Sequence, residues 1–532
     1  MASFWPSGGH AAAATASAET LKTGERLARE GLPSRRVPAC AQCHGAALTG
    51  VAPGAPGLLG LPRDYLNAQL GAWRTGQRRA HAPDCMAEVA QRLALDDVNA
   101  VATWLAAQPV PANSKPAARL PQPAPLRCGT APPATATAAA PAHAPAPRSE
   151  QVQRGAYLAR AGNCATCHTA RGGAAWAGGR AIETPFGTVY AGNITPDRAT
   201  GIGGWSADDF WRALHEGKSK DGRLLYPAFP YTSYTQVSRA DADALYAYLM
   251  SLPPVAQANT PHALRWPYST QAALWAWRTL YFSPGGYTSD TKQSAEWNRG
   301  AYLVRGLGHC AACHTSRNAL GATDDKLDLA GGLIPAQNWY APSLAAASEA
   351  GVADWPLNDI ASLLKTGTSP RASVLGPMAE VVQHSTQHLS DADLNAMAVY
   401  LKALPPAPAG ARTEPPPVAA SVASRGAKLY EQHCAQCHGE RGEGVAGAYP
   451  RLAGNRTVTM ATTANLVQVV LNGGFAPATA GNPRPYGMPP YVLLLNDADT
   501  APVLSHIRNA WGNRAAPVSE LDVSRQRSSV RP

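Results

Sequence analysis

The sequence reads CAQCH at residues 40–44, CATCH at 164–168, CAACH at 310–314 and CAQCH at 434–438. C-x-x-C-H is the attachment signature of c-type haem, in which both thiols bond to the porphyrin and the histidine binds the iron. A redox-active C-x-x-C needs no following histidine, and a zinc site needs two such pairs close together. We therefore predict four covalently bound haems c. Their predicted attachment residues are Cys40, Cys43, Cys164, Cys167, Cys310, Cys313, Cys434 and Cys437, and their predicted iron ligands are His44, His168, His314 and His438.

Length and composition indicate several small globular domains. The chain has 532 residues, of which 45% are hydrophobic and 15% charged, with 47 Pro and 48 Gly. A chain of this length is expected to divide into several domains, and its composition is not that of a disordered or fibrous protein. The formal net charge is +10. Because the propionates of four haems would offset much of that charge, we expect no nucleic-acid partner.

A repeated tripeptide precedes three of the four motifs. Arg-Gly-Ala begins at Arg154, Arg299 and Arg425, and Thr23-Gly24-Glu25 occupies the matching place before the first motif. A glycine on a helix that has no capping role usually allows close packing by another element. The expected partners are aromatic residues on the helix that closes each domain. These closing helices are predicted at 96–107, 241–252 and 391–404 and carry Trp104, Tyr248 and Tyr400, while a fourth near 501–511 is less regular.

The predicted fold is mainly α, with four consecutive class I cytochrome c-like helical domains joined by Pro/Ala-rich linkers. The expected boundaries are 18–108 for domain 1, 109–149 for a linker, 150–255 for domain 2, 256–294 for an aromatic connecting segment, 295–406 for domain 3, 407–421 for a second linker and 422–514 for domain 4.

Two cysteines lie outside the haem motifs. In an oxidising compartment, a leftover pair such as Cys85 and Cys128 suggests a disulfide, which would hold the linker against the first domain. Two unrelated buried thiols are the alternative.

Haem attachment of this type takes place beyond the bacterial inner membrane, so we expect a periplasmic protein. No signal peptide is visible at the start of the sequence, and no run of 18 apolar residues suggests a transmembrane helix. The segment 271–282 (QAALWAWRTLYF) is rich in Trp and Tyr. It is either a helix packed between domains or an interfacial contact with a membrane or a partner, which leaves a peripheral position on the inner membrane open.

Residues 150–513 resemble the triheme cytochrome c subunit of membrane-associated bacterial dehydrogenases of the alcohol, gluconate and molybdenum-hydroxylase types. The first domain resembles a separate single-haem class I cytochrome c. The matching stretches are TPFGTVY at 184–190, NITPD at 193–197, GGWS at 203–206, AEWNRGAYL at 295–303, GPMAEVV at 376–382 and YGMPP at 486–490.

A methionine thioether opposite the histidine stabilises ferrous iron and raises its potential. Position along each domain and the resemblance together predict Met86, Met378 and Met488 as these second ligands. Met397 lies on a closing helix at core spacing, and Met460 lies outside the expected ligand loop. His81, His384 and His388 have ordinary surface or packing interpretations.

The second domain departs from this pattern. Where relatives with a methionine ligand read Tyr-Pro-Ala-Met-Pro-Tyr, this chain reads YPAFPY at 226–231, with Phe229 at the ligand position. Met250 is expected to face away from the haem, and His215 is the other candidate ligand. Either another side chain or water fills the sixth position, or the haem is five-coordinate or weakly ligated, with a lower potential.

Two functional classes follow. The first is an electron-transfer subunit that carries electrons from a quinoprotein, flavoprotein or molybdenum dehydrogenase subunit to ubiquinone or a cytochrome, with no substrate turnover and no catalytic residues of its own. The second is a haem enzyme or small-ligand sensor that uses an open coordination position at the second haem.

Overall fold

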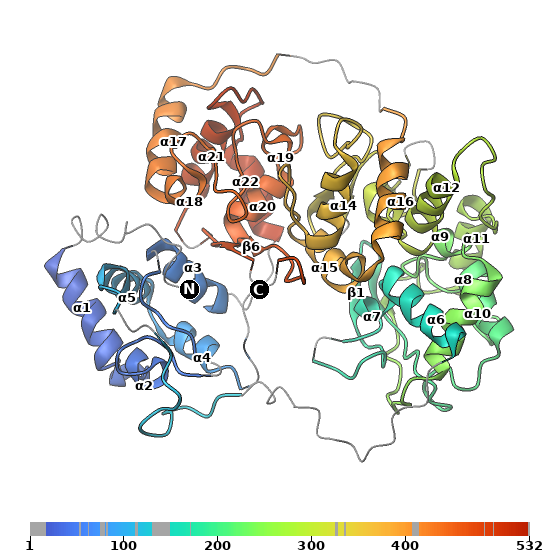
Figure 1. Cartoon of the computed structure of the whole chain (residues 1–532), viewed down its shortest axis with the longest axis horizontal. Helices are drawn as coiled ribbons and strands as arrows, with labels where there is room; N and C mark the ends of the chain where they lie inside the picture. The colour runs from blue at the N-terminus through green and yellow to red at the C-terminus, as the bar shows by residue number, and fades with distance from the viewer. Residues whose placement is uncertain are drawn as a thin grey trace.

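The computed structural model of the chain describes residues 17–52, 55–61, 63–74, 80, 83–111, 115–129, 149–170, 172–324, 328–334, 337–406, 414–482, 485–492 and 494–529. The fold is mainly α, as predicted, with a few short antiparallel strands (Figure 1). Much of the two linkers predicted at 109–149 and 407–421 lies outside the described residues. The division into four domains stays a prediction, and we describe the chain as four units in sequence order.

The first unit contains α1 (Ala18–Arg29), η3 (Pro33–Arg35), α2 (Cys40–His44), α3 (Arg63–Arg74), α4 (Cys85–Arg92) and α5 (Leu95–Ala107). The second contains α6 (Glu150–Ala161), α7 (Cys164–Cys167), β1 (Ala181–Thr184), β2 (Gly187–Tyr190), α8 (Ala207–Glu216), α9 (Tyr231–Tyr234) and α10 (Arg239–Met250). Then come β3 (Ala263–Leu264) and α11 (Gln271–Tyr281), and β3 pairs with β2 to complete a three-stranded sheet.

The third unit contains α12 (Ala295–Tyr302), η4 (Leu303–Leu307), α13 (Ala311–His314), the antiparallel pair β4 (Gly332–Ile334) and β5 (Trp339–Ala341), α14 (Leu357–Thr366), α15 (Pro377–His384), η6 (Thr386–His388) and α16 (Asp391–Lys402). The fourth contains α17 (Ala420–His433), α18 (Ala435–His438), α19 (Arg456–Thr459), α20 (Ala464–Asn472), the antiparallel pair β6 (Gly474–Phe475) and β7 (Gly487–Met488), α21 (Asp497–Asn509) and α22 (Glu520–Ser529).

The first and the closing helix of each unit cross at the glycine that the sequence singled out. A Cβ atom added to Gly155 on α6 would lie 1.9 Å from the Ala244 carbonyl oxygen and 2.7 Å from the Cβ of Tyr248, both on α10. A glycine therefore lets the two backbones approach more closely than any side chain would allow. The same contact recurs between Gly24 and Trp104, Gly300 and Tyr400, and Gly426 and His506. The expected glycine–aromatic contacts are confirmed, and the fourth unit supplies a histidine as partner.

The second and third units are joined by reciprocal hydrogen bonds from a shared RGAY sequence. Arg154 pairs with Asp241 of its own closing helix (2.7 Å), and Asp241 also accepts from the hydroxyl of Tyr302 in the third unit (2.6 Å). In return, Arg299 pairs with Asp393 (2.8 Å), which accepts from the hydroxyl of Tyr157 in the second unit (2.6 Å). Burial by itself would raise the pKa of Asp393, but the hydrogen bonds from Arg299 and Tyr157 hold it below its ordinary value.

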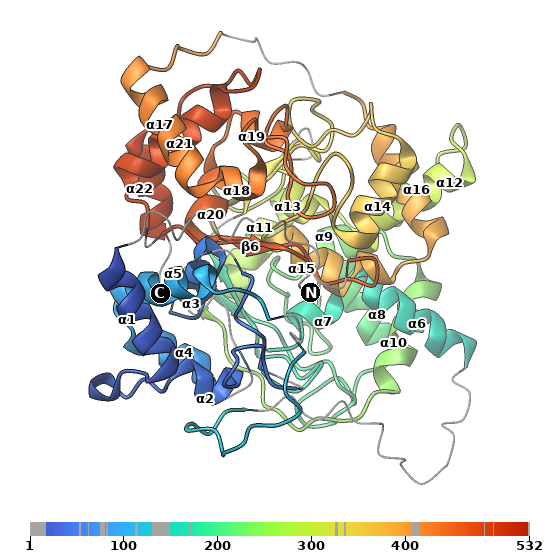
Figure 2. The ribbon, with the colours of Figure 1, turned by 60° about the vertical axis from the view of Figure 1, so that its left-hand side comes forward.

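Buried apolar side chains form one continuous cluster through the second and third units, so these two share a core. The first and fourth units have separate clusters. The fourth unit contacts the third through Asn465, whose side chain exchanges two hydrogen bonds with the backbone of Tyr340, and through an ion pair between Arg456 and Asp354. Figures 1 and 2 both show α1–α5 beside the fourth unit, although the chain continues from α5 into the second unit.

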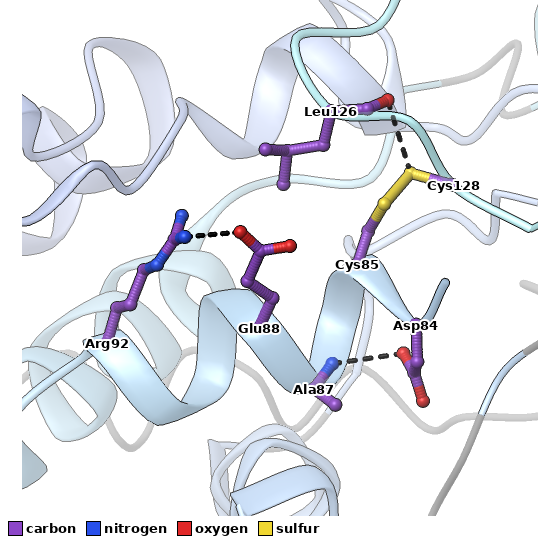
Figure 3. The surroundings of a disulfide bond; sticks show 7 residues. All are labelled: Asp84, Cys85, Ala87, Glu88, Arg92, Leu126 and Cys128. Carbon is purple, nitrogen blue, oxygen red and sulfur yellow. Dashed lines mark hydrogen bonds and ion pairs between the residues drawn. A yellow bond between two sulfur atoms is a disulfide. The ribbon is translucent and has the colours of Figure 1, made fainter. Parts of the chain in front are cut away.

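The extra cysteines form the predicted disulfide. Cys85 at the start of α4 is bonded to Cys128, and their Cα atoms are 5.3 Å apart (Figure 3). The backbone N–H of Gly129 donates to Pro83 (2.9 Å), and the N–H of Ala52 donates to Ala117 (2.8 Å). The start of the linker is thus held against the first unit, as the sequence suggested.

The tight helix crossing generates a prediction about stability. Gly300→Ala places a methyl group within 2.0 Å of the Ala396 carbonyl oxygen, so the two helices must separate. We expect the free energy of unfolding to fall by about 1–3 kcal/mol, the usual cost of overpacking. Urea denaturation of the holoprotein, followed by circular dichroism, measures this loss. Gly286→Ala is the matched control, because nothing lies within 4 Å of the added Cβ atom; equal effects of the two substitutions would contradict the prediction.

Candidate cofactor sites

The four histidines of the C-x-x-C-H motifs share one hydrogen-bonding arrangement. In each, Nδ1 lies at hydrogen-bond distance from a backbone carbonyl oxygen in the loop that follows the motif. The pairs are His44 with Pro56 (2.8 Å), His168 with Gly192 (2.7 Å), His314 with Pro342 (2.7 Å) and His438 with Pro450 (2.9 Å).

This hydrogen bond decides which ring nitrogen can bind a metal. A carbonyl oxygen only accepts, so Nδ1 carries the proton and Nε2 keeps its lone pair. Burial lowers the pKa of all four histidines, and the carbonyl contact offsets part of that effect. Each ring is therefore neutral, oriented and ready to bind iron through Nε2, as an axial haem ligand requires.

Sequence reasoning did not find these four carbonyl acceptors. A backbone carbonyl has no residue-type signature, and the separations from histidine to acceptor differ between units. In the first and fourth units the acceptor follows its histidine by 12 residues, whereas in the second and third it follows by 24 and 28. The longer loops contain the hairpins β1–β2 and β4–β5. Three of the four acceptors are prolines, which is the one signal that the sequence offered.

The eight motif cysteines form no disulfide in the structure, unlike Cys85 and Cys128. Burial raises the pKa of Cys40 to about 11 and that of Cys164 and Cys310 to about 12. A redox-active dithiol needs a lowered thiol pKa, so these pairs are unsuited to disulfide exchange. Among the described residues, no three His, Cys, Asp or Glu side chains gather as a zinc site requires. The donor set fits thioether attachment of haem.

The second and third sites open into one cavity of about 2750 Å³. Cys164, Cys167 and His168 line it from the second unit, and Cys313 lines it from the third. Pockets for drug-sized ligands occupy about 300–1,000 Å³, so this cavity has room for two large prosthetic groups. The thiols of Cys167 and Cys313 are also close enough to interact electrostatically. The two attachment sites are therefore neighbours.

The predicted methionine ligands are all half-buried. Met378 on α15 packs against the cluster that also contacts Cys310, and Met488 on β7 packs against the cluster that contacts Cys434. Met86 on α4 follows the disulfide-bonded Cys85. Iron ligation by the four histidines and these three methionines stays a prediction.

The remaining candidates lie in different surroundings. Met397 and Met460 are buried. His384 and His388 are exposed, and His81 lies outside the described residues. Phe229 lines the shared cavity, whereas His215 and Met250 are not among its described lining residues.

Comparison with known proteins agrees with this geometry. The cytochrome c family matches residues 152–253 and 423–511. The chain is 41% identical to the cytochrome c subunit of a quinone-dependent alcohol dehydrogenase from Gluconacetobacter polyoxogenes, over 74% of this chain and 87% of the relative. It is 40% identical to the gluconate 2-dehydrogenase cytochrome c subunit of Pantoea cypripedii (70% and 88%). It is 36% identical to the fructose dehydrogenase cytochrome subunit of Gluconobacter japonicus (71% and 82%).

Proposed function

Because the chain belongs to the family of multihaem c-type cytochromes that form the cytochrome c subunits of dehydrogenases, we propose that it is a tetrahaem electron-transfer subunit of a periplasmic dehydrogenase. One observation carries the count of four: each C-x-x-C-H histidine has the same Nδ1-to-carbonyl hydrogen bond, including the one in the first unit. The disulfide between Cys85 and Cys128 supports an oxidising compartment such as the periplasm.

When bound, haem supplies one-electron chemistry, and the chain's residues hold and tune it. The paired cysteines fix each group covalently. The buried, neutral histidines offer Nε2, and the carbonyls of residues such as Pro342 orient the rings. Apolar side chains of the shared core exclude water, and Met378 and Met488 would favour the reduced state at the third and fourth sites.

The shared cavity supports direct electron transfer between the second and third sites, because Cys167 and Cys313 line the same space. We propose that a catalytic subunit of the quinoprotein, flavoprotein or molybdenum type supplies the electrons. Ubiquinone or a downstream cytochrome would receive them. The relatives' names include alcohol, gluconate and fructose dehydrogenases, which suggests a small alcohol or sugar derivative as the substrate of that partner.

The haem count is directly measurable. A pyridine haemochrome assay on the purified holoprotein should give four haems per chain, each retained after acid–acetone extraction because thioether bonds are covalent. Replacing Cys40 and Cys43 by serine should reduce the count to three. A native protein with three or fewer haems and all eight cysteines intact would contradict the proposal.

The isolated chain should carry electrons without oxidising substrates. Reductive titration should take up four electrons per chain, one at each predicted haem. We expect no turnover of alcohols, aldehydes, sugars or heteroaromatic compounds with a dye acceptor, since the described sites contain haem-binding groups and no separate catalytic centre. Substrate-dependent dye reduction by the homogeneous chain would overturn this assignment.

A surface helix supports peripheral membrane contact. None of the described helices is both long and apolar enough to cross a bilayer. On α11, Ala276, Thr279 and Leu280 line the shared cavity, whereas the exposed residues Ala272 and Trp275 are not among its lining residues. Trp275 is 66% exposed. An exposed face that is apolar and contains tryptophan suits the interface between lipid headgroups and acyl chains, so we propose that α11 lies on the periplasmic surface of the membrane.

This contact predicts vesicle binding. The holoprotein should sediment with vesicles of phosphatidylethanolamine and phosphatidylglycerol, and Trp275→Lys should reduce the bound fraction about tenfold by removing apolar area and an interfacial anchor. Leu521→Lys is the matched control, because Leu521 is an equally exposed helical residue on α22 (58%). If both variants bind vesicles as the native chain does, α11 is not the membrane contact.

A further inference from the structure

The second unit has no methionine where the other three have their predicted ligand. Phe229 precedes the aromatic residue of its closing helix, Tyr248, by 19 positions. Met86 precedes Trp104 by 18 positions, and Met378 precedes Tyr400 by 22. A phenyl ring has no lone pair to give to iron. The question is whether another side chain of this chain takes its place.

Phe229 lines the cavity of the second site. Its half-buried ring packs against the shared core and lines the cavity that also contains His168. The ring meets Tyr234 edge-on, with centroids 5.4 Å apart. Leu245 and Leu249 of α10 line the same cavity. Phe229 therefore has an aromatic neighbour in Tyr234, and Leu245 and Leu249 add apolar surface to the same cavity.

The two substitutes suggested by the sequence are directed elsewhere. On α10, Leu245 and Leu249 face the cavity, and Met250 is not among the described residues that line it. His215 of α8 stacks on Trp211, with ring centroids 4.5 Å apart, and is also not among those lining residues. Neither side chain is placed to bind an iron atom held by His168.

Two other histidines do line the cavity. His262 accepts a hydrogen bond at Nδ1 from the backbone N–H of Tyr190 (3.2 Å), so its neutral ring carries the proton on Nε2 and offers no free lone pair. His309 donates from Nδ1 to Leu307 (2.8 Å), which leaves the lone pair of Nε2 free, and its ring contacts Tyr234 edge-on (5.5 Å). Tyr234 itself donates its hydroxyl proton to Gly162 (3.2 Å). Tyr234 thus contacts both Phe229 and His309, and His309 is the side chain whose ligation the test must exclude.

We propose that the haem attached at Cys164 and Cys167 has no sixth ligand from this chain and binds a small neutral diatomic molecule on the face covered by Phe229, Leu245 and Leu249. The apolar lining favours a neutral ligand over an anion such as cyanide, because burying an unpaired charge is costly. Loss of the thioether also lowers the potential of this haem relative to its methionine-ligated neighbours. The site goes beyond electron transfer, because it can make the second haem sensitive to a dissolved gas.

Carbon monoxide is the probe for this site. The dithionite-reduced holoprotein, shown to contain four haems, should bind one carbon monoxide per chain, seen as a Soret change of about a quarter of the total haem. Phe229→Met should abolish this binding and raise the potential of one haem in a redox titration. Phe229→Leu should keep it, because leucine preserves an apolar side chain without supplying a sulfur lone pair.

Two further variants make the test specific. Phe186→Met, the same substitution at a cavity residue on the β1–β2 turn, should leave carbon monoxide binding unchanged. Met378→Phe should raise the stoichiometry to two by opening the third site. A native chain that binds no carbon monoxide overturns the proposal. If carbon monoxide binds only to the His309→Ala variant, then His309 is the sixth ligand and the proposal is also wrong. The readout is the isolated chain's spectrum, so failure here leaves the electron-transfer assignment intact.

Discussion

The close crossing of two helices at a glycine is the constraint on which each unit depends. The first helix bears the glycine, the closing helix bears a carbonyl and a large ring, and the C-x-x-C-H turn comes next in the chain after the first helix, directly or after a short connection. Because the crossing fixes both helices, it also fixes where the two thiols and the histidine lie. A methyl group at Gly155 or Gly300 would meet backbone rather than a flexible side chain, so the strain could not be relieved locally.

The tyrosine that ends the RGAY sequence of the first helix links the second unit to the third. RGAY at 154–157 and 299–302 places a tyrosine one position after the alanine, and each hydroxyl reaches the aspartate of the other unit. The fourth unit reads RGAK at 425–428, where Arg425 pairs with Asp499 and no phenol is present to bridge. The second and third units accordingly share one core and one cavity, whereas the fourth keeps its own core. This pairing brings Cys167 and Cys313 together and so favours electron transfer between their haems.

The second site resembles the other three at its motif histidine, His168, and differs from them at residue 229. His168 has the same carbonyl partner geometry as the other three histidines, which keeps Nε2 available. At this site the chain has Phe229 where the other units have a predicted methionine ligand, and Phe229 lines the cavity that also contains His168. If the proposal is right, a single side chain separates a haem suited to electron transfer from one that can take an external ligand.

Several features were determined by the sequence because they depend on neighbouring residues along the chain. The C-x-x-C-H turns, the glycine on each first helix, the mainly α fold and the absence of a methionine at residue 229 all follow from local patterns. The pairing of Cys85 with Cys128 could also be inferred, since eight of the ten cysteines were already assigned. Other features were decided only by tertiary structure. The carbonyls that orient the histidines have no residue-type signature, and the merging of two cores depends on hydroxyl groups that meet aspartates more than 60 positions away. The sequence of α11 was compatible with packing or with an interface. Only the folded chain shows that Trp275 is exposed while Ala276, Thr279 and Leu280 line the shared cavity, because exposure depends on all the surrounding elements together.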